Sequence, residues 1–187
     1  MLTITRKKDN RIVKCILHRV ADIPGGVTVK VADLGGSALF EGTPLGKGAN
    51  GLFQVVKTAQ IITKAADNAT SYDVAKGHHF KVGDYFATAA CNGQQITAID
   101  KSNAAKDVIT VGTTLGAEIT AGTCAFESKS GEKTPKYAPI AVAGTNHDVE
   151  PSTNLFVDAW VIGVIYENNA PIVNDAIKTA LRGVQYI

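Results

Sequence analysis

Alternation of apolar and polar residues at a period of two is the feature that most constrains how this chain can fold. In the stretch GVTVKVA, Val27, Val29 and Val31 fall on one side, and Thr28 and Lys30 fall on the other. Successive side chains of a β-strand point to opposite faces of a sheet, so this spacing is typical of a half-buried strand. Further β-rich runs are LFQVV at 52–56, QQITAID at 94–100, DVITVG at 107–112 and WVIGVIY at 160–166.

These runs indicate a mainly β protein. The polar spacer KSNAAK at 101–106 predicts a hairpin with a loop longer than the tight two-residue type. The run at 160–166 is apolar on both faces, which predicts a central, covered strand. Short strands punctuated by turn residues, together with 18 glycines, favour barrels or sandwiches over βαβ units.

One helix is expected near the C-terminus, in APIVNDAIKTALRG at 170–183. Pro171 suits a first helical turn, where its missing N–H costs nothing. Apolar residues recur at helical spacing on one face of this segment, with polar residues on the other. Gly183 is placed to end the helix, and the final VQYI then forms an edge strand or a tail.

Two polar segments rich in turn formers, KAADNATS at 64–71 and ESKSGEKTPK at 127–136, suggest internal boundaries. The block between them has the size of a small β-barrel. We therefore expect a β-module at 66–129 inserted into an outer domain, a β-sandwich or barrel-like fold made of 1–65 and 130–187. Two domains in tandem are the alternative.

The charge balance argues against nucleic acid as a partner, because 19 basic and 17 acidic residues give a net charge of only +2. The compact basic run Arg6, Lys7 and Lys8 is followed by Asp9. Such a run is typical of a solvated face, and contact with a phosphate or an acidic partner is the alternative interpretation.

Cysteine usage and hydropathy predict a protein made and folded in a cytoplasm, without a membrane span. Cys15, Cys91 and Cys124 are far apart and form no CxxC pair, so we expect reduced, buried thiols and neither a zinc site nor a redox site. The N-terminus lacks the apolar core of a signal peptide. The stretch AWVIGVIY at 159–166 is too short to cross a bilayer.

The segment KGHHFKVGDYF at 76–86 holds the residues that most suggest chemistry. His78, His79 and Asp84 could belong to a metal-dependent hydrolase. However, neighbouring side chains on a strand point to opposite faces, and no HExxH-type spacing is present. The structural interpretation is favoured: Phe80 and Val82 share one strand face, Gly83 makes a turn that Asp84 stabilises, and Tyr85–Phe86 begin the next strand.

No other motif predicts a catalytic, cofactor-binding or metal-binding residue. The chain contains no GxSxG nucleophile motif. GKGANG at 46–51 has GxGxxG spacing but lacks the strand before it and the helix after it that a dinucleotide site requires, so a surface loop is expected. Trp160, the only tryptophan, is expected in a core or an interface.

Several longer segments carry a resemblance to a known family. The chain from about Val20 onward resembles tailed-phage head fibre and capsid decoration (auxiliary capsid) proteins, notably those of phages of gut Bacteroidales, including crAss-like phages. The segments that carry it are GTPLGKGANGLFQVVKTA, VAKGHHFKVGDYF, ITAIDKSNAAKDVITVGTTLGAEITAG and VDAWVIGVIYENNAPIVNDAIKTALRGVQYI.

This resemblance implies a non-enzymatic virion protein, made in the host cytoplasm, that decorates or stabilises the capsid surface. The implied partners are the major capsid protein, further copies in a homotrimer and other head fibre proteins. Trimer formation would bury apolar surface. The candidate residues for the oligomer or capsid interface are Trp160, Ile177, Leu181, Arg6, Lys7 and Lys8.

Two alternatives to decoration stay open at this point. The chain could be the capsid-proximal part of a head fibre, with the inserted module binding a host surface ligand through an aromatic groove that contains Tyr72, Tyr85 and Phe86. The other alternative is the metal-dependent hydrolase that uses His78 and its neighbours.

Overall fold

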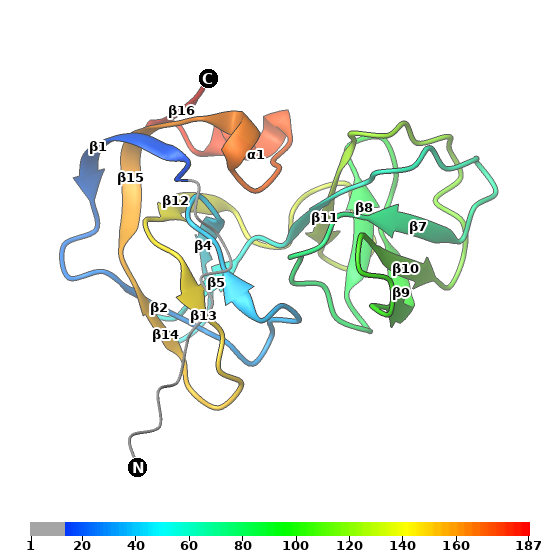
Figure 1. The fold of residues 1–187 in the computed structure, drawn as a ribbon, viewed down its shortest axis with the longest axis horizontal. Coiled ribbons are helices and arrows are strands. Elements are labelled where there is room, and N and C mark those ends of the chain that lie inside the picture. Colours follow the sequence, from blue (N-terminus) through cyan, green and yellow to red (C-terminus); the bar gives the residue numbers. More distant parts are fainter. Residues whose placement is uncertain (1–13) are drawn as a thin grey trace, which may run out of the picture.

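The computed structural model describes residues 14–187, which form two β-rich lobes side by side (Figure 1). The outer lobe contains an eight-stranded sheet, a two-stranded sheet and one α-helix near the C-terminus. The inserted lobe is a six-stranded sheet built from residues 58–128, and strands of the outer lobe precede and follow it in sequence. The predicted mainly β fold with an inserted barrel-like module and a C-terminal helix is therefore confirmed.

The eight-stranded sheet follows the path β1-β15-β12-β4-β5-β2-β14, and β16 pairs in parallel with β15. The sheet curls back on itself, because β14 at one end of the path leads through Asp158 directly into β15, which lies next to the other end. Barrel-like closure of this kind encloses the strand faces that carry apolar residues. The strands are β1 (Ile16–Asp22), β2 (Val27–Val29), β4 (Pro44–Lys47), β5 (Phe53–Val55), β12 (Pro139–Ala143), β14 (Leu155–Val157), β15 (Ala159–Ile165) and β16 (Val184–Tyr186).

The alternation of apolar and polar residues along the strands determines which side chains form the core of the outer lobe. Val27, Val29 and Val31 are all buried, as their spacing predicted, and Val27 and Val29 lie on the enclosed side with Leu45 and Val55. The two-stranded sheet, β3 (Ala38–Leu39) with β13 (His147–Asp148), adds Leu39 to the same core.

The strand at β15 is central, as predicted, because β1 and β12 pair with it on either side. It is not covered on both faces along its whole length, since Ile162 is 43% exposed.

The helix is shorter than its sequence pattern predicted. A 3₁₀ turn at Glu167–Asn169 is followed by α1, which spans only Asp175–Ala180. The side chain of Asn174 accepts a hydrogen bond from the N–H of Ile177 at 2.9 Å and so caps the helix there. Pro171 therefore lies before the helix and not in its first turn. No helix within residues 14–187 is long and apolar enough to cross a membrane.

The inserted lobe follows the path β6-β11-β8-β9-β10-β7 and curls until its two ends meet. Ile61 bridges Val74, and the N–H of Ala75 donates to the carbonyl of Gln60 at 2.8 Å. The predicted hairpin of β9 and β10 is present. The strands are β6 (Thr58–Gln60), β7 (Ser71–Val74), β8 (Tyr85–Thr88), β9 (Gln94–Asp100), β10 (Asp107–Val111) and β11 (Cys124–Ser128).

Aromatic side chains fill the inserted lobe. The rings of Tyr72 and Phe80 each lie 5.4 Å from that of Phe86, and all three are buried. This core is separate from the cores of the outer lobe.

The three cysteines, Cys15, Cys91 and Cys124, form no disulfide and are buried, in agreement with their predicted role as small apolar side chains.

The first boundary of the insertion differs from the expected residue 66. Cys124 and Phe126 of β11 pair with Gln60 and Thr58, so β6 belongs to the inserted lobe. The polar segment 64–71 is a loop inside this lobe, because Ala65 bridges Ile119. A polar, turn-rich segment marks any exposed loop, and it predicts a domain boundary only where the chain also changes sheets.

Candidate functional site

Charged and histidine side chains gather where the two lobes meet, and this region is called the junction below. The chain crosses the junction twice, once at Lys57 between β5 and β6, and once between β11 and β12. The crossings run side by side: the N–H of Glu127 donates to the carbonyl of Lys57 at 3.0 Å, and that of Lys136 donates to the carbonyl of Glu127 at 2.9 Å.

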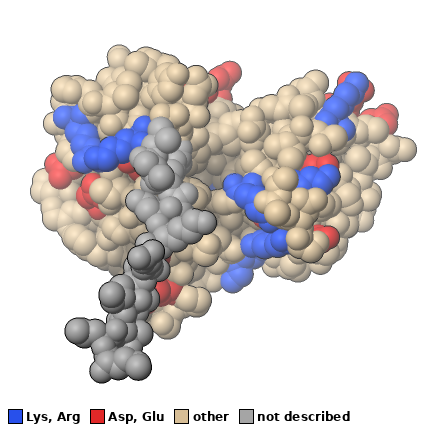
Figure 2. Space-filling model, viewed as in Figure 1, with Lys and Arg blue, Asp and Glu red and all other residues tan. Residues whose placement is uncertain are grey.

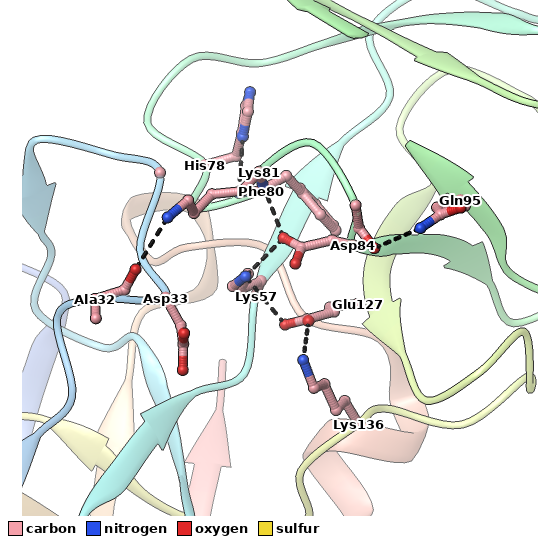
Figure 3. Close-up of polar contacts among 12 residues, drawn as sticks. Ala32, Asp33, Lys57, His78, Phe80, Lys81, Asp84, Gln95, Glu127 and Lys136 are labelled. Atoms are coloured by element: carbon pink, nitrogen blue, oxygen red, sulfur yellow. Dashed lines mark hydrogen bonds and ion pairs between the residues drawn. The ribbon is translucent and has the colours of Figure 1, made fainter. Parts of the chain in front are cut away.

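Four charged side chains form a compact cluster at these crossings (Figure 3). Lys57 Nζ lies 2.6 Å from Asp84 Oδ2 and 3.3 Å from Glu127 Oε2. Lys136 Nζ lies 2.5 Å from Glu127 Oε1. The side chains of Lys57 and Glu127 are only 3% and 2% exposed. Two cations thus face two carboxylates in a largely buried site, and their charges balance.

Burial and pairing act against one another on Glu127. Burial raises its pKa, and the positive charges of Lys57 and Lys136 offset only part of that effect. For Lys136, burial alone would lower the pKa, but the hydrogen bond to Glu127 and its charge outweigh burial and raise it. The charged state of Glu127 is therefore favoured by its two lysine partners, and that of Lys136 is favoured by Glu127.

The lobes also meet through backbone groups of the outer-lobe loop at 31–37. The N–H of Gly35 donates to the carbonyl of His79 at 3.0 Å. Lys81 Nζ donates to the carbonyl of Ala32 at 3.0 Å, and Lys101 Nζ donates to that of Gly35 at 2.8 Å. These contacts require close backbone approach, because a Cβ atom on Gly35 would lie 2.1 Å from the carbonyl oxygen of Phe80.

Replacing Gly35 by alanine should therefore lower the free energy of unfolding by about 1–3 kcal/mol, since the backbones must separate to admit the methyl group. Gly112→Ala is the matched control, because a Cβ there would meet no atom closer than 3.7 Å. Urea unfolding of both variants measures the difference. Equal stability of the two variants would show that the lobes do not approach one another closely at Gly35.

The two adjacent histidines lie at the junction, and both are 4% exposed. The Nδ1 of His78 accepts from the N–H of Phe80 at 3.2 Å, and its Nε2 lies 3.1 Å from Asp107 Oδ2. This arrangement assigns the proton of the neutral ring to Nε2. Burial lowers the pKa of each histidine to about 4, so both rings are neutral at pH 7.

The structural interpretation of this segment is partly confirmed. Gly83 has a φ of +97°, as a turn glycine can, and Asp84 accepts from the N–H of Lys81 at 2.8 Å. Tyr85 begins β8 as predicted. The expected strand with Phe80 and Val82 on one face is wrong: residues 78–81 are irregular, Phe80 is fully buried and Val82 is 62% exposed.

The geometry does not bring His78, His79 and Asp84 together as metal ligands. His78 is directed at Asp107, whereas Asp84 binds Lys57 and a backbone amide. In the part of the chain that the structure describes, no group of three or more His, Cys, Asp or Glu side chains could hold a metal ion. The three residues named for a hydrolase therefore do not form one shared site.

Two of the predicted interface residues lie elsewhere than expected. Ile177 and Leu181 are 0% and 2% exposed, because they pack against β15 and β16 in the core beneath α1. An amphipathic helix buries its apolar face within its own chain when a sheet is available, so they are not interface residues. Trp160 is half-buried on β15. The third predicted group, Arg6, Lys7 and Lys8, lies outside the described residues.

The aromatic groove expected of a ligand-binding fibre is not formed by the predicted residues. Tyr72 and Phe86 are 1% and 0% exposed, and both belong to the core of the inserted lobe. In β8 only Tyr85 is half-buried, and the three residues that follow it are buried. Lys and Arg side chains appear on both lobes in the view of Figure 2, with Asp and Glu near them, which agrees with the low net charge.

The buried cluster was not anticipated from sequence, although a signal for it exists. Lys57 interrupts the apolar run LFQVVKTAQII, and Glu127 interrupts CAFES. A lone charge within a buried strand pattern indicates a paired charge, because an unpaired one would be too costly. No protein-family model, curated protein or solved structure matches this chain.

Proposed function

We propose that this chain is a non-enzymatic structural protein of a tailed-phage virion that decorates or stabilises the capsid surface, as a homotrimer bound to the major capsid protein. The resemblance of most of the chain to head fibre and capsid decoration proteins supports this proposal. The polar groups that most suggested catalysis, His78 and Asp84, are engaged in contacts within the junction.

The observation that carries the proposal is the exposed edge strand β1. Its residues Leu17 and Val20 are 58% and 59% exposed, and Ile162 on the adjacent β15 is 43% exposed. Among the described residues, β1 pairs with β15 alone, so β1 is an edge strand of the sheet. A long edge strand with exposed apolar side chains is a surface to which another chain can pair.

Trp160 lies on the same pair of strands and remains a candidate residue for the oligomer or capsid interface. Its register partner on β1 is Asp22, and the guanidinium of Arg19 lies 5.4 Å from the centre of its ring. Its indole N–H donates to Asp158 at 3.3 Å. Tryptophan and arginine are the side chains that most often dominate binding energy at protein interfaces. We place the oligomer or capsid contact at β1 and β15 instead of at α1.

Density-gradient centrifugation with empty capsids tests the proposed function. The purified protein should sediment with the capsids at a fixed number of copies per shell, saturating as its concentration rises. A protein that stays at the top of the gradient at every concentration would contradict a role in decoration.

Replacing Val20 by aspartate should weaken self-association by at least about tenfold, or ~1.4 kcal/mol, because the new charge must be desolvated in the contact. Val82→Asp is the matched control: Val82 is 62% exposed but lies on the inserted lobe. Sedimentation equilibrium of both variants measures the shift. If Val20→Asp associates as the unmodified chain does, the contact lies elsewhere.

A further inference from the structure

The ring of His79 lies where the two lobes contact one another. It belongs to the inserted lobe but packs against the outer-lobe loop so closely that a Cβ on Gly36 would lie 2.9 Å from its Nδ1. The carbonyl of the same residue accepts the N–H of Gly35 at 3.0 Å. Any change in the hydration or charge of this ring therefore acts directly on the contact between the lobes.

The charged groups around His79 are unfavourable for a protonated ring. Those that act on it are Lys57 from the β5–β6 crossing, Lys101 from the end of β9 and the neighbouring His78, all of which oppose a positive charge. A backbone contact at Ala38 favours the charge but is weaker than these. Within residues 14–187, no carboxylate is among the groups that act on His79.

His78 has a different environment. Asp107 faces it from β10, and that carboxylate favours a proton on the ring, while Lys101 and Lys76 oppose it. Lys76 Nζ itself lies 2.6 Å from Asp107 Oδ1, so the carboxylate is shared. His78 also borders a cleft of about 430 Å³ that is lined by both lobes, including Phe40, Thr58, Lys76 and Pro171.

We propose that the junction is an acid-sensitive joint: protonation of His79, assisted by His78, separates the inserted lobe from the outer lobe while each lobe keeps its own fold. The lobes have separate cores and are joined by the two crossings and by the contacts of the 31–37 loop with His79, Lys81 and Lys101, so they can part without loss of either core. This inference holds whether or not the chain is a capsid protein.

The direction of the pH effect follows from burial. In the closed joint the histidine pKa is lowered to about 4, whereas a hydrated histidine has an ordinary pKa of 6.5. The closed joint therefore binds fewer protons than the open one. It is favoured above pH 6.5 and loses its advantage progressively as the pH falls toward 4.

Hydrogen–deuterium exchange of the full chain at pH 7.5 and pH 5.0, corrected for intrinsic exchange rates, tests the joint. Peptides covering 31–38 and 76–81 should lose protection by at least about tenfold at pH 5.0, while peptides of β9 and β10 keep theirs. Unchanged protection at the junction would overturn the proposal. So would a loss of protection in β9 and β10 to the same extent, because that result indicates global unfolding.

The variant His79→Gln identifies the trigger, since glutamine is polar but does not titrate. The junction of this variant should exchange at the same corrected rate at both pH values, whereas His18→Gln, at an exposed position, should behave as the unmodified chain. An unaltered acid response in His79→Gln would assign the effect to another group. If His79→Gln does not fold, the exchange pattern of the unmodified chain still decides whether the junction opens before the barrels.

Discussion

Replacing Lys57 by methionine should lower the free energy of unfolding by about 3–5 kcal/mol, the largest effect expected of any single substitution discussed for this chain. Methionine fills a similar volume and removes the one cation within residues 14–187 that contacts both Asp84 and Glu127. Glu127 is 2% exposed, so its buried charge would keep only Lys136 as an ion-pair partner among the described residues. Urea unfolding at pH 7.5 gives the change.

An exposed ion pair provides the control for this substitution. Lys64 lies 2.9 Å from Glu118, but the two side chains are 61% and 57% exposed. Lys64→Met should therefore change the stability by no more than about 1 kcal/mol. The double variant Lys57→Met with Glu127→Met should recover part of the loss, because the more deeply buried of the two carboxylates that Lys57 contacts is removed with it. A cost below about 1 kcal/mol for Lys57→Met would show that the cluster contributes little to stability.

Acidification from pH 6.5 to pH 4 should lower the free energy of unfolding by up to about 3 kcal/mol for each of His78 and His79. Both have a pKa of about 4 in the folded protein, against 6.5 when hydrated. The folded state therefore binds fewer protons, and the stability that these histidines confer is complete above pH 6.5 and declines as the pH falls. Glu127, whose pKa burial raises, offsets part of this decline.

Urea titrations at several pH values measure this dependence. The variant His78→Gln with His79→Gln should show a much flatter profile between pH 6.5 and 4, whereas His18→Gln should follow the unmodified chain. The pKa values of Asp33, Asp73 and Asp100 are lowered, so these residues contribute mainly below this window. A flat profile in the unmodified protein would contradict the buried, neutral state of the histidine pair.

Local sequence patterns predicted the strands well, for a physical reason. The alternation at Val27, Val29 and Val31 reflects one face against a core, and the face of a strand is set by neighbours in sequence. The same logic located β9, β10 and β15. Helix length was less predictable, because Asn174 competes for backbone N–H groups and ends the extension toward Pro171.

The junction is predictable only in part, because it depends on residues far apart in sequence. Lys57 and Glu127 are marked as unusual by their apolar surroundings, but nothing local indicates that they meet one another or that Lys136 joins them. The histidines in KGHHFKVGDYF marked this segment as a candidate site, and the structure places both of them at the junction. Their partner Asp107 comes from β10, however, so spacing within that segment could not show where His78 points.

The mass of the protein in solution, measured by light scattering during size exclusion, alone and with empty capsids, tests the central claim most directly. We expect three times the chain mass of 19.6 kDa when the protein is alone, and elution together with the capsids when both are present. A monomer that elutes apart from the capsids would contradict the proposed role in the virion.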